Sequence, residues 1–324
     1  MHIPDGYLSP KTCAVFFAGM LPVWYFASKR VESELKLKNL PLLALGAAFT
    51  FVIMMFNIPI PGGSSGHMVG SVVVAIALGP WAGVIALSLA LILQAFLFGD
   101  GGVLAIGANS FNMAFVMSFA GYWSYRAASF GSPGRARKTA AAAIAGYAAV
   151  NLAALAVGIE LGIQPSIAAG ADGRPLYAPY PLYISIPAMM VPHALFLGPV
   201  EAIGTALVVS YMEKTMGGEL ARAGKSARPL WTALVVLAVL TPLGLLAVGT
   251  PWGEWGKSEI LEMIGYVPSG MDRYDGAWKG VLPDYGHPSA GGRIGSSFVY
   301  IVSAAVGSLA AVLAIWLWGK RWRK

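Results

Sequence analysis

Long apolar runs are the feature that most constrains this chain. Nine runs carry at most one charged residue each, near residues 12–28, 40–56, 67–79, 81–98, 103–125, 139–160, 186–212, 230–249 and 296–318. A helix needs about 20 apolar residues to cross a bilayer, so the third run is short for a span unless it is tilted, re-entrant or extended by its flanks. With 57% hydrophobic and 11% charged residues, the chain is too apolar for an ordinary soluble domain. The sequence predicts an all-α polytopic membrane bundle of about nine transmembrane helices.

Positive charges fall in blocks between these runs, and the blocks predict an orientation. Sixteen of the 22 basic residues share one side of the membrane if the N-terminus is extracytoplasmic: Lys29, Arg30, Lys36, Lys38, Arg126, Arg135, Arg137, Lys138, Lys214, Arg222, Lys225, Arg228, Lys320, Arg321, Arg323 and Lys324. The positive-inside rule then places the N-terminus outside and the C-terminus in the cytoplasm. Nine spans, an odd number, agree with termini on opposite sides. Because topology explains the net charge of +7, no nucleic-acid partner is predicted.

The chain opens MHIPDGYLSP, with Asp5 ahead of the first cation, Lys11. A secretory signal carries a basic region before its apolar stretch, so we expect these first residues to be retained at the outer face. A free terminus followed by a histidine at position 2 offers three nitrogens to one metal ion. They are the terminal amine, the amide of residue 2 and imidazole Nδ1, which form adjacent five- and six-membered chelate rings.

A second stretch, NIPIPGGSSGHMVG at residues 57–70, is predicted on the same outer face. Its prolines and glycines exclude regular helix from Pro59 to Gly66, and His67 follows at the start of the third run. We therefore predict that His2 and His67 converge on one outer pocket, with His67 as the fourth nitrogen ligand. Planar nitrogen coordination suits Ni(II) or Cu(II), whereas zinc prefers a tetrahedron, so nickel is favoured.

Other polar residues have weaker assignments. Asp5 is expected to order the terminal turn or to hold a ligand's second ring N–H, and Ser64 and Ser65 to shape the facing loop. Glu201 lies in the seventh run, eight residues after His193. An intramembrane carboxylate suggests a way-station for a transported cation, although helix-packing hydrogen bonds are the favoured interpretation. Eight residues of helix rise about 12 Å, so these two side chains are not expected to share one metal.

The outer segment from about residue 250 to 295 carries six acidic residues and one histidine: Glu254, Glu259, Glu262, Asp272, Asp275, Asp284 and His287. No ligand spacing stands out among them, and acidic residues in a loop are commonly solvated. The favoured interpretation is therefore a solvated segment anchored by its tryptophans, rather than a cation-collecting surface.

Three motifs together resemble a known family. MHIPDGYLSP, then PGGSSGH some fifty residues later, then GPVEA at residues 198–202 resemble the NikM/CbiM family, the substrate-binding components of energy-coupling factor transporters for nickel and cobalt. The resemblance covers about residues 1–215 and implies metal binding by the amine and backbone of Met1 and His2, the imidazole of His2, and His67. It also implies two kinds of partner: a transmembrane coupling protein (T/Q-type) and cytoplasmic ATPase subunits (A/O-type).

Residues 216–324 resemble the small N-type accessory subunit (NikN/CbiN) of the same systems. The likeness rests on TPLGLLAVGTPWGEWG and on two spans flanking an extracytoplasmic segment. The resemblance implies an M–N fusion in a prokaryotic plasma or inner membrane, joined through the basic stretch 213–229. The one stretch similar to a phosphate loop, GVLAIGAN, lacks the required Lys and Ser/Thr, so this chain is not expected to be an ATPase or another enzyme.

Two alternatives stay open at this level. Residues 62–66, GGSSG, satisfy the G-x-S-x-G pattern, and residues 63–66 also satisfy the G-x-S-G pattern of rhomboid-type intramembrane serine proteases. His193 on a later run is a possible base for such an enzyme. A proton-coupled secondary metal transporter that uses Glu201 is the other. Nickel and cobalt are not separated by the sequence, because first-row divalent ions share ligands.

Overall fold

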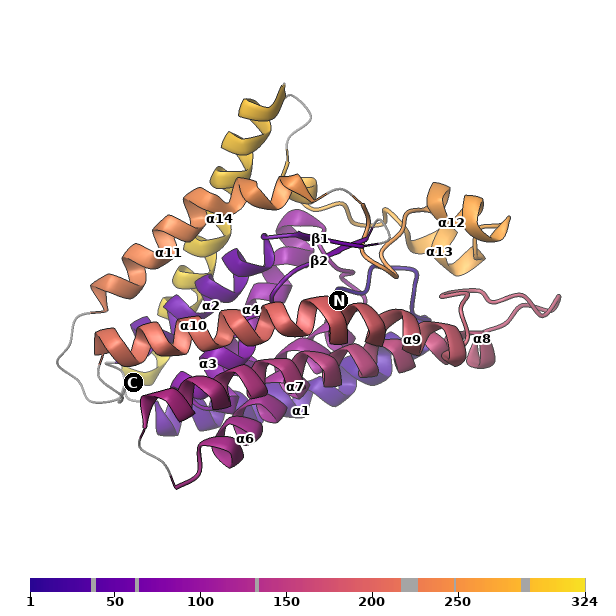
Figure 1. Ribbon diagram of the computed structural model, residues 1–324. Coiled ribbons are helices and arrows are strands. Elements are labelled where there is room, and N and C mark those ends of the chain that lie inside the picture. The colour runs from indigo at the N-terminus through magenta and orange to yellow at the C-terminus, as the bar shows by residue number, and fades with distance from the viewer. Residues whose placement is uncertain are drawn as a thin grey trace.

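Helices make up most of the chain in the computed structural model, which describes residues 1–35, 39–61, 64–131, 134–216, 227–247, 249–286 and 292–323 (Figure 1). The α-helices are α1 (Pro10–Glu34), α2 (Leu40–Met54), α3 (Ser71–Leu78), α4 (Pro80–Leu93), α5 (Ile106–Asn109), α6 (Met117–Ser129), α7 (Arg135–Gly162), α8 (Gln164–Ile167), α9 (Leu182–Pro192), α10 (Gly198–Met216), α11 (Arg228–Leu240), α12 (Lys257–Ile264), α13 (Ser269–Tyr274) and α14 (Gly292–Gly319). The π-helical turn η2 (Gln94–Phe98) continues α4 and ends at Gly99, whereas η3 (Ser110–Val116) joins α5 to α6 and η4 (His193–Leu197) joins α9 to α10. Three 3-10 helices, η5 (Thr241–Leu246), η6 (Pro283–Tyr285) and η7 (Lys320–Arg323), complete the helical elements.

Among the residues that the structure describes, five helical segments are long and apolar enough to cross a membrane: Pro80–Phe98, Arg135–Ile167, Leu182–Thr215, Arg228–Leu246 and Gly292–Gly319. The prediction of a helical membrane bundle is therefore confirmed, while the count of nine spans and the orientation of the termini stay predictions. The third apolar run forms only the eight residues of α3, about 12 Å of helix, which is too short to cross the hydrocarbon core.

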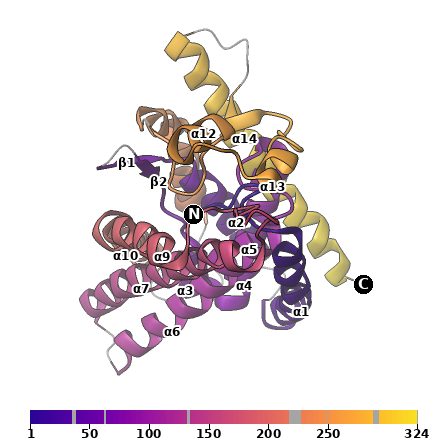
Figure 2. The same cartoon turned by 90° about the vertical axis from the view of Figure 1, so that its right-hand side faces the viewer.

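Small residues let α7 lie close to its neighbours. Alanine recurs at helical spacing along its buried face, at positions 141, 145, 149 and 153, and such stripes allow backbones to approach closely. One close approach is to α10, since a Cβ built on Gly146 would lie 2.8 Å from the backbone oxygen of Glu201. Helices α6, α9 and α10 therefore gather around α7 (Figures 1 and 2).

The stretch before α3 forms a short antiparallel hairpin, so the fold is not purely helical. Strand β1 (Ile58–Ile60) pairs with β2 (Ser64–Gly66) in the register Ile58 to Gly66. Helix is absent from the described residues between Pro59 and Gly66, as predicted, and Gly62 and Gly63 lie outside the described residues. The sequence predicts that the third run starts at His67, but the helix begins four residues later, at Ser71. Gly70, with a left-handed φ of +77°, caps α3, which begins at Ser71.

The C-terminal part contributes two helices at the side of the bundle and a folded outer segment. Helix α14 packs on α2 so closely that a Cβ on Gly307 would lie 2.0 Å from the Phe51 ring. Between α11 and α14, the chain forms α12 and α13, which lie toward the right-hand end of the molecule in Figure 1 and face the viewer in Figure 2. Several residues weighed in the sequence lie outside the described residues: Lys36, Lys38, Arg222, Lys225 and His287.

Candidate metal site at the N-terminus

The first residues of the chain are buried rather than frayed. Met1, His2 and Ile3 expose only 8%, 3% and 1% of their surface. The backbone N–H of Ile3 donates to Asn109 Oδ1 at 2.8 Å, and Asn109 Nδ2 donates back to the Ile3 carbonyl at 3.1 Å. Gly102 N–H also donates to that carbonyl, at 2.9 Å. The N–H and the carbonyl of Ile3 are thus both hydrogen-bonded, so this terminus has a fixed position, unlike most chain ends.

Asp5 fastens the turn that follows. Its two carboxylate oxygens accept the backbone N–H groups of Val103 at 3.0 Å and Leu104 at 2.9 Å. Burial raises the pKa of Asp5, and these backbone donors oppose the rise. Gly102 allows the close approach, because a Cβ there would lie 2.5 Å from the Asp5 nitrogen. Of the two roles expected for Asp5, ordering the terminal segment is the one its hydrogen bonds serve.

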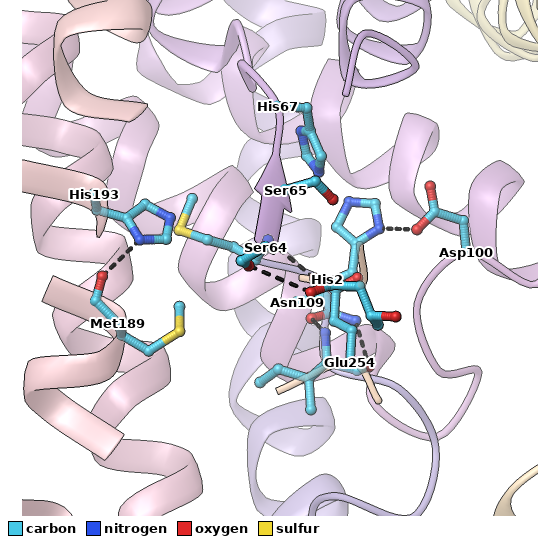
Figure 3. A network of polar contacts seen from close by, with 12 residues as sticks. His2, Ser64, Ser65, His67, Asp100, Asn109, Met189, His193 and Glu254 are labelled. Carbon is cyan, nitrogen blue, oxygen red and sulfur yellow. Dashed lines mark hydrogen bonds and ion pairs between the residues drawn. The ribbon is translucent and has the colours of Figure 1, made fainter. Parts of the chain in front are cut away.

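His2 is held by a carboxylate that sequence reasoning missed. Its Nδ1 bonds to Asp100 Oδ1 (Figure 3). The Tyr285 hydroxyl donates to the other oxygen of Asp100. Burial by itself would raise the pKa of Asp100, but the charge and hydrogen bond of His2 and the hydrogen bond of Tyr285 hold it well below its usual range. Because a carboxylate only accepts, Nδ1 carries the proton here. The sequence feature that could have indicated Asp100 is the stretch FGDGG, which places a single acidic residue between two apolar runs.

His67 faces His2, as the sequence predicted. The two ring centroids are 5.1 Å apart, with the rings nearly perpendicular (Figure 3). His67 Nδ1 lies 3.1 Å from the Met68 carbonyl, which only accepts, so Nδ1 is the protonated nitrogen. Nε2 of His67 therefore carries a lone pair, the state in which histidines bind metals. The buried Nε2 of His2 has no hydrogen-bond partner among the described residues.

The terminal amine forms an ion pair with the outer segment. Met1 N lies 3.3 Å from Glu254 Oε1. Burial raises the pKa of Glu254, and the charge of the nearby amine partly offsets that rise. The expectation that the acids of this segment are simply solvated is therefore wrong for Glu254, whose side chain is only 18% exposed. The sequence motif PWGEWG contains Glu254, but it does not predict the partner of this residue, because Met1 lies 253 positions away in the sequence.

Ser64 and Ser65 connect the hairpin to the same outer segment. The Ser65 hydroxyl donates to the Gly249 carbonyl at 2.8 Å, and the Ser64 hydroxyl donates to the Thr250 carbonyl at 3.3 Å. His193 Nδ1 instead bonds to the Met189 carbonyl of its own helix at 2.7 Å. Neither hydroxyl is paired with His193, so the arrangement lacks the nucleophile–base contact that a serine protease uses.

Glu201 reaches the loop that carries His67. Its two carboxylate oxygens accept the N–H groups of Val69 at 2.7 Å and Gly70 at 3.0 Å. The side chain is fully buried. The predicted hydrogen-bonding role is thus observed, although the bonds go to loop backbone rather than to another helix. His193 and Glu201 make separate contacts and do not form a shared site.

The arrangement brings together the nitrogens that a planar metal complex needs. The amine of Met1, the backbone of residue 2 and the rings of His2 and His67 occur in one buried region, flanked by the carboxylates of Asp100 and Glu254. In the part of the chain that the structure describes, no cluster of three or more His, Cys, Asp or Glu side chains is placed as metal ligands. Two of the nitrogens predicted to bind metal, the terminal amine and the amide of residue 2, belong to the main chain and not to side chains.

Comparison with known proteins supplies the family. Residues 2–217 match the family described as "Cobalt uptake substrate-specific transmembrane region". The chain belongs to this NikM/CbiM family. It is 44% identical over 306 residues to the "Fused nickel transport protein NikMN" of Rhodobacter capsulatus, with 88% of each chain covered. It is 46% identical over 282 residues to the "Probable fused nickel transport protein LarMN" of Lactiplantibacillus plantarum, with 84% of each covered.

A solved structure extends the likeness of this NikM/CbiM member to three dimensions. The "Crystal Structure of an Truncated Transition metal Transporter" is 53% identical with a TM-score of 0.62, covering 66% of this chain and 99% of that one. The fused relatives show that the chain joins an M-type region to an N-type region. It is a multi-pass membrane component of the nickel and cobalt transport family and not itself an enzyme.

Proposed function

We propose that the protein captures a Ni(II) ion, or alternatively Co(II), at the outer face of a prokaryotic plasma or inner membrane. The observation that carries the proposal is the approach of His67 to His2 beside a buried terminal amine. The metal ligands are the amine of Met1, the amide nitrogen and Nδ1 of His2, and Nε2 of His67. These four nitrogens favour a planar complex.

Metal capture exchanges partners on the terminal side of the site. The amine gives up its contact with Glu254, and Nδ1 of His2 gives up its contact with Asp100. A metal ligand must be deprotonated, so the amine and the residue-2 amide each release one proton as the metal binds. Nδ1 of His2 also gives up its proton, and the neutral imidazole then carries its one proton on Nε2. The two carboxylates remain nearby and balance the charge of the bound ion. His67 needs no such exchange because its Nε2 already carries a lone pair.

The capture site serves a larger transporter. The chain acts as the substrate-binding component of an energy-coupling factor transporter, with a transmembrane coupling protein and cytoplasmic ATPase subunits as partners. Nine spans place the N-terminus outside and the C-terminus in the cytoplasm. Residues 1–215 form the metal-binding module, and residues 216–324 form the N-type module, whose outer segment at about 250–295 reaches the site through Glu254. Both ATP hydrolysis and coupling belong to the partners.

Extension of the N-terminus tests this proposal directly. The purified protein with its native start is compared with a variant carrying two glycines ahead of Met1, with nickel and cobalt content and affinity as the readouts. The native protein is expected to bind one ion, and the extended protein to lose at least about 100-fold in affinity, because the amine that closes the first chelate ring is displaced. Extension of the C-terminus by the same residues is the matched control. Equal binding by both N-terminal forms would overturn the chelate.

A further inference from the structure

We propose that Glu201 is the positioning residue for the His67 ligand, so that helix α10 determines where the fourth nitrogen of the site stands. The inference rests on the proposed function, since it takes His67 as a metal ligand. It replaces the idea of Glu201 as a way-station for the transported ion with a fixed structural role toward that ion.

The contact between Glu201 and the His67 loop is direct and complete. The N–H groups of Val69 and Gly70, two and three residues after His67, each donate to a different carboxylate oxygen, at 2.7 and 3.0 Å. Val69 and Glu201 expose none of their surface, so water does not substitute for either bond. Charged acceptors also bind N–H groups more strongly than neutral ones do. Each carboxylate oxygen of Glu201 thus holds one backbone N–H group of the loop.

The rest of the loop packs on the same helical face. A Cβ on Gly66 would lie 2.6 Å from Leu197 Cδ1, and a Cβ on Gly204 would lie 2.3 Å from Met68 Sδ. Leu197, Glu201 and Gly204 are spaced by four and three residues, which places them on one side of a helix. The neighbours of His67 on both sides therefore rest on α10 and its preceding turn, with Glu201 at the centre of the contact.

The helix that carries Glu201 is itself tightly supported. Gly146 of α7 lies against the Glu201 backbone, where a Cβ would approach the carbonyl oxygen to 2.8 Å. Further along the two helices, Lys138 Nζ pairs with Glu213 Oε1 at 3.2 Å. Because the helices α7 and α10 position the loop that carries His67, a shift of the two helices moves that loop as well. Helix α10 therefore links the outer site to its own opposite end.

A double-mutant cycle tests the assignment. Nickel affinity is measured by competition titration for the wild type, Glu201→Gln, His67→Ala and the double variant, all with the native N-terminus. Glu201→Gln places an amide donor against an N–H donor, so we expect a 10- to 100-fold loss of affinity, as for other groups that orient a ligand. In the His67→Ala background the same change is expected to cost less than about threefold, because the oriented ligand is already absent.

Two controls separate positioning from general damage. Glu160→Gln alters another buried carboxylate of the bundle, which accepts from Asn112 Nδ2 at 2.8 Å, and it is expected to leave nickel affinity unchanged. The visible absorption band of the nickel complex in Glu201→Gln is expected to shift toward that of His67→Ala. If Glu201→Gln does not fold, Glu201→Asp keeps both acceptor oxygens on a shorter stem and is expected to give a smaller loss, again only when His67 is present.

The outcomes distinguish this inference from the function on which it rests. Loss of affinity in Glu201→Gln that disappears in the His67→Ala background supports it. Equal losses in both backgrounds, or no loss in either, overturn it while leaving His67 as a ligand. Nickel binding by His67→Ala as tight as that of the wild type overturns the proposed site itself, and this inference with it.

Discussion

The two segments that meet at the site, residues 1–5 and residues 64–70, are held by different kinds of contact. In the terminal segment, the groups proposed to bind metal are themselves occupied: the amine by Glu254 and Nδ1 of His2 by Asp100. In the hairpin loop, the backbone is fixed by Glu201 while Nε2 of His67 keeps its lone pair. One half of the site must therefore exchange partners on capture, whereas the other half is preorganised.

This difference suggests how one pocket combines selectivity with release. A preorganised ligand reduces the ordering cost of binding. An exchangeable half, by contrast, returns to a satisfied state when the metal leaves, because its buried charges regain their carboxylate partners. Buried charges without partners are costly, so Glu254 and Asp100 stabilise the buried amine of Met1 and the ring of His2.

Loss of a histidine from either half is expected to have the largest effect. His2→Ala and His67→Ala each remove one ligand nitrogen, and each should lower nickel affinity by at least about 100-fold, more than changes to supporting groups usually do. Isothermal titration against a competing chelator measures the change. His193→Ala is the matched control, since its ring bonds to the Met189 carbonyl of its own helix. If either variant keeps full affinity, its half of the site does not bind metal.

Gly102→Ala should break the terminal half without touching a proposed ligand. The added Cβ would lie 2.5 Å from the Asp5 nitrogen and 2.8 Å from the Pro4 carbonyl carbon, so the backbone of the terminal segment must shift. We expect about a 10-fold or greater loss of nickel affinity, because the chelate is displaced from His67. Gly19→Ala in α1, where nothing lies within 4 Å of the new Cβ, should change nothing. Unaltered affinity in Gly102→Ala would show that the segment is not held in place from this side.

Glu254→Gln tests whether the amine contact is exchangeable. Removing the charge destabilises the protonated amine of the metal-free protein, so the competition for the amine weakens and nickel affinity should stay the same or rise, by up to about fivefold. Titration at constant pH and salt measures this. Glu262→Gln on the same outer segment serves as the control. A 10-fold loss would contradict the exchange and would indicate that Glu254 helps to bind the ion.

Ser65→Ala should have the smallest effect. The variant loses the hydrogen bond to the Gly249 carbonyl, which is expected to lower the free energy of unfolding by about 1 kcal/mol. Nickel affinity should stay within about threefold of the wild type, because the bond lies outside the ligand set. Thermal melting and metal titration of the same sample give both numbers. A complete loss of function in this variant would instead favour the serine protease alternative.

The helical membrane fold could be predicted from the apolar runs, but the local departures from helix could not be placed in detail. The prolines and glycines before His67 indicated irregular backbone, and the structure forms a hairpin there with α3 starting at Ser71. The π-helical turn at His193–Leu197 had no sequence signal. Hydropathy averages over many residues, so it detects a span and not a shifted register within it.

The approach of His2 to His67 could be predicted because topology places both on one face. The partners of the site could not, because each depends on a long-range contact. Asp100 lies 98 positions from His2, and Glu201 lies 132 positions from Val69. The outer acids carry no ligand spacing, so nothing in the local pattern distinguishes Glu254 from a solvated neighbour. Tertiary structure makes that distinction by burying one acid beside the terminal amine.

The ion pair between Met1 and Glu254 also determines when, during synthesis, the N-terminus can reach its final environment. The two residues are 253 positions apart, and at about 5–20 residues per second a ribosome needs roughly 10–50 s to make that length of chain. Throughout that interval the first residue of the protein exists without its carboxylate partner. The N-terminal segment, which is synthesised first, thus reaches its final environment only after the outer segment has been synthesised. A chain truncated before the outer segment lacks the ion pair between Met1 and Glu254.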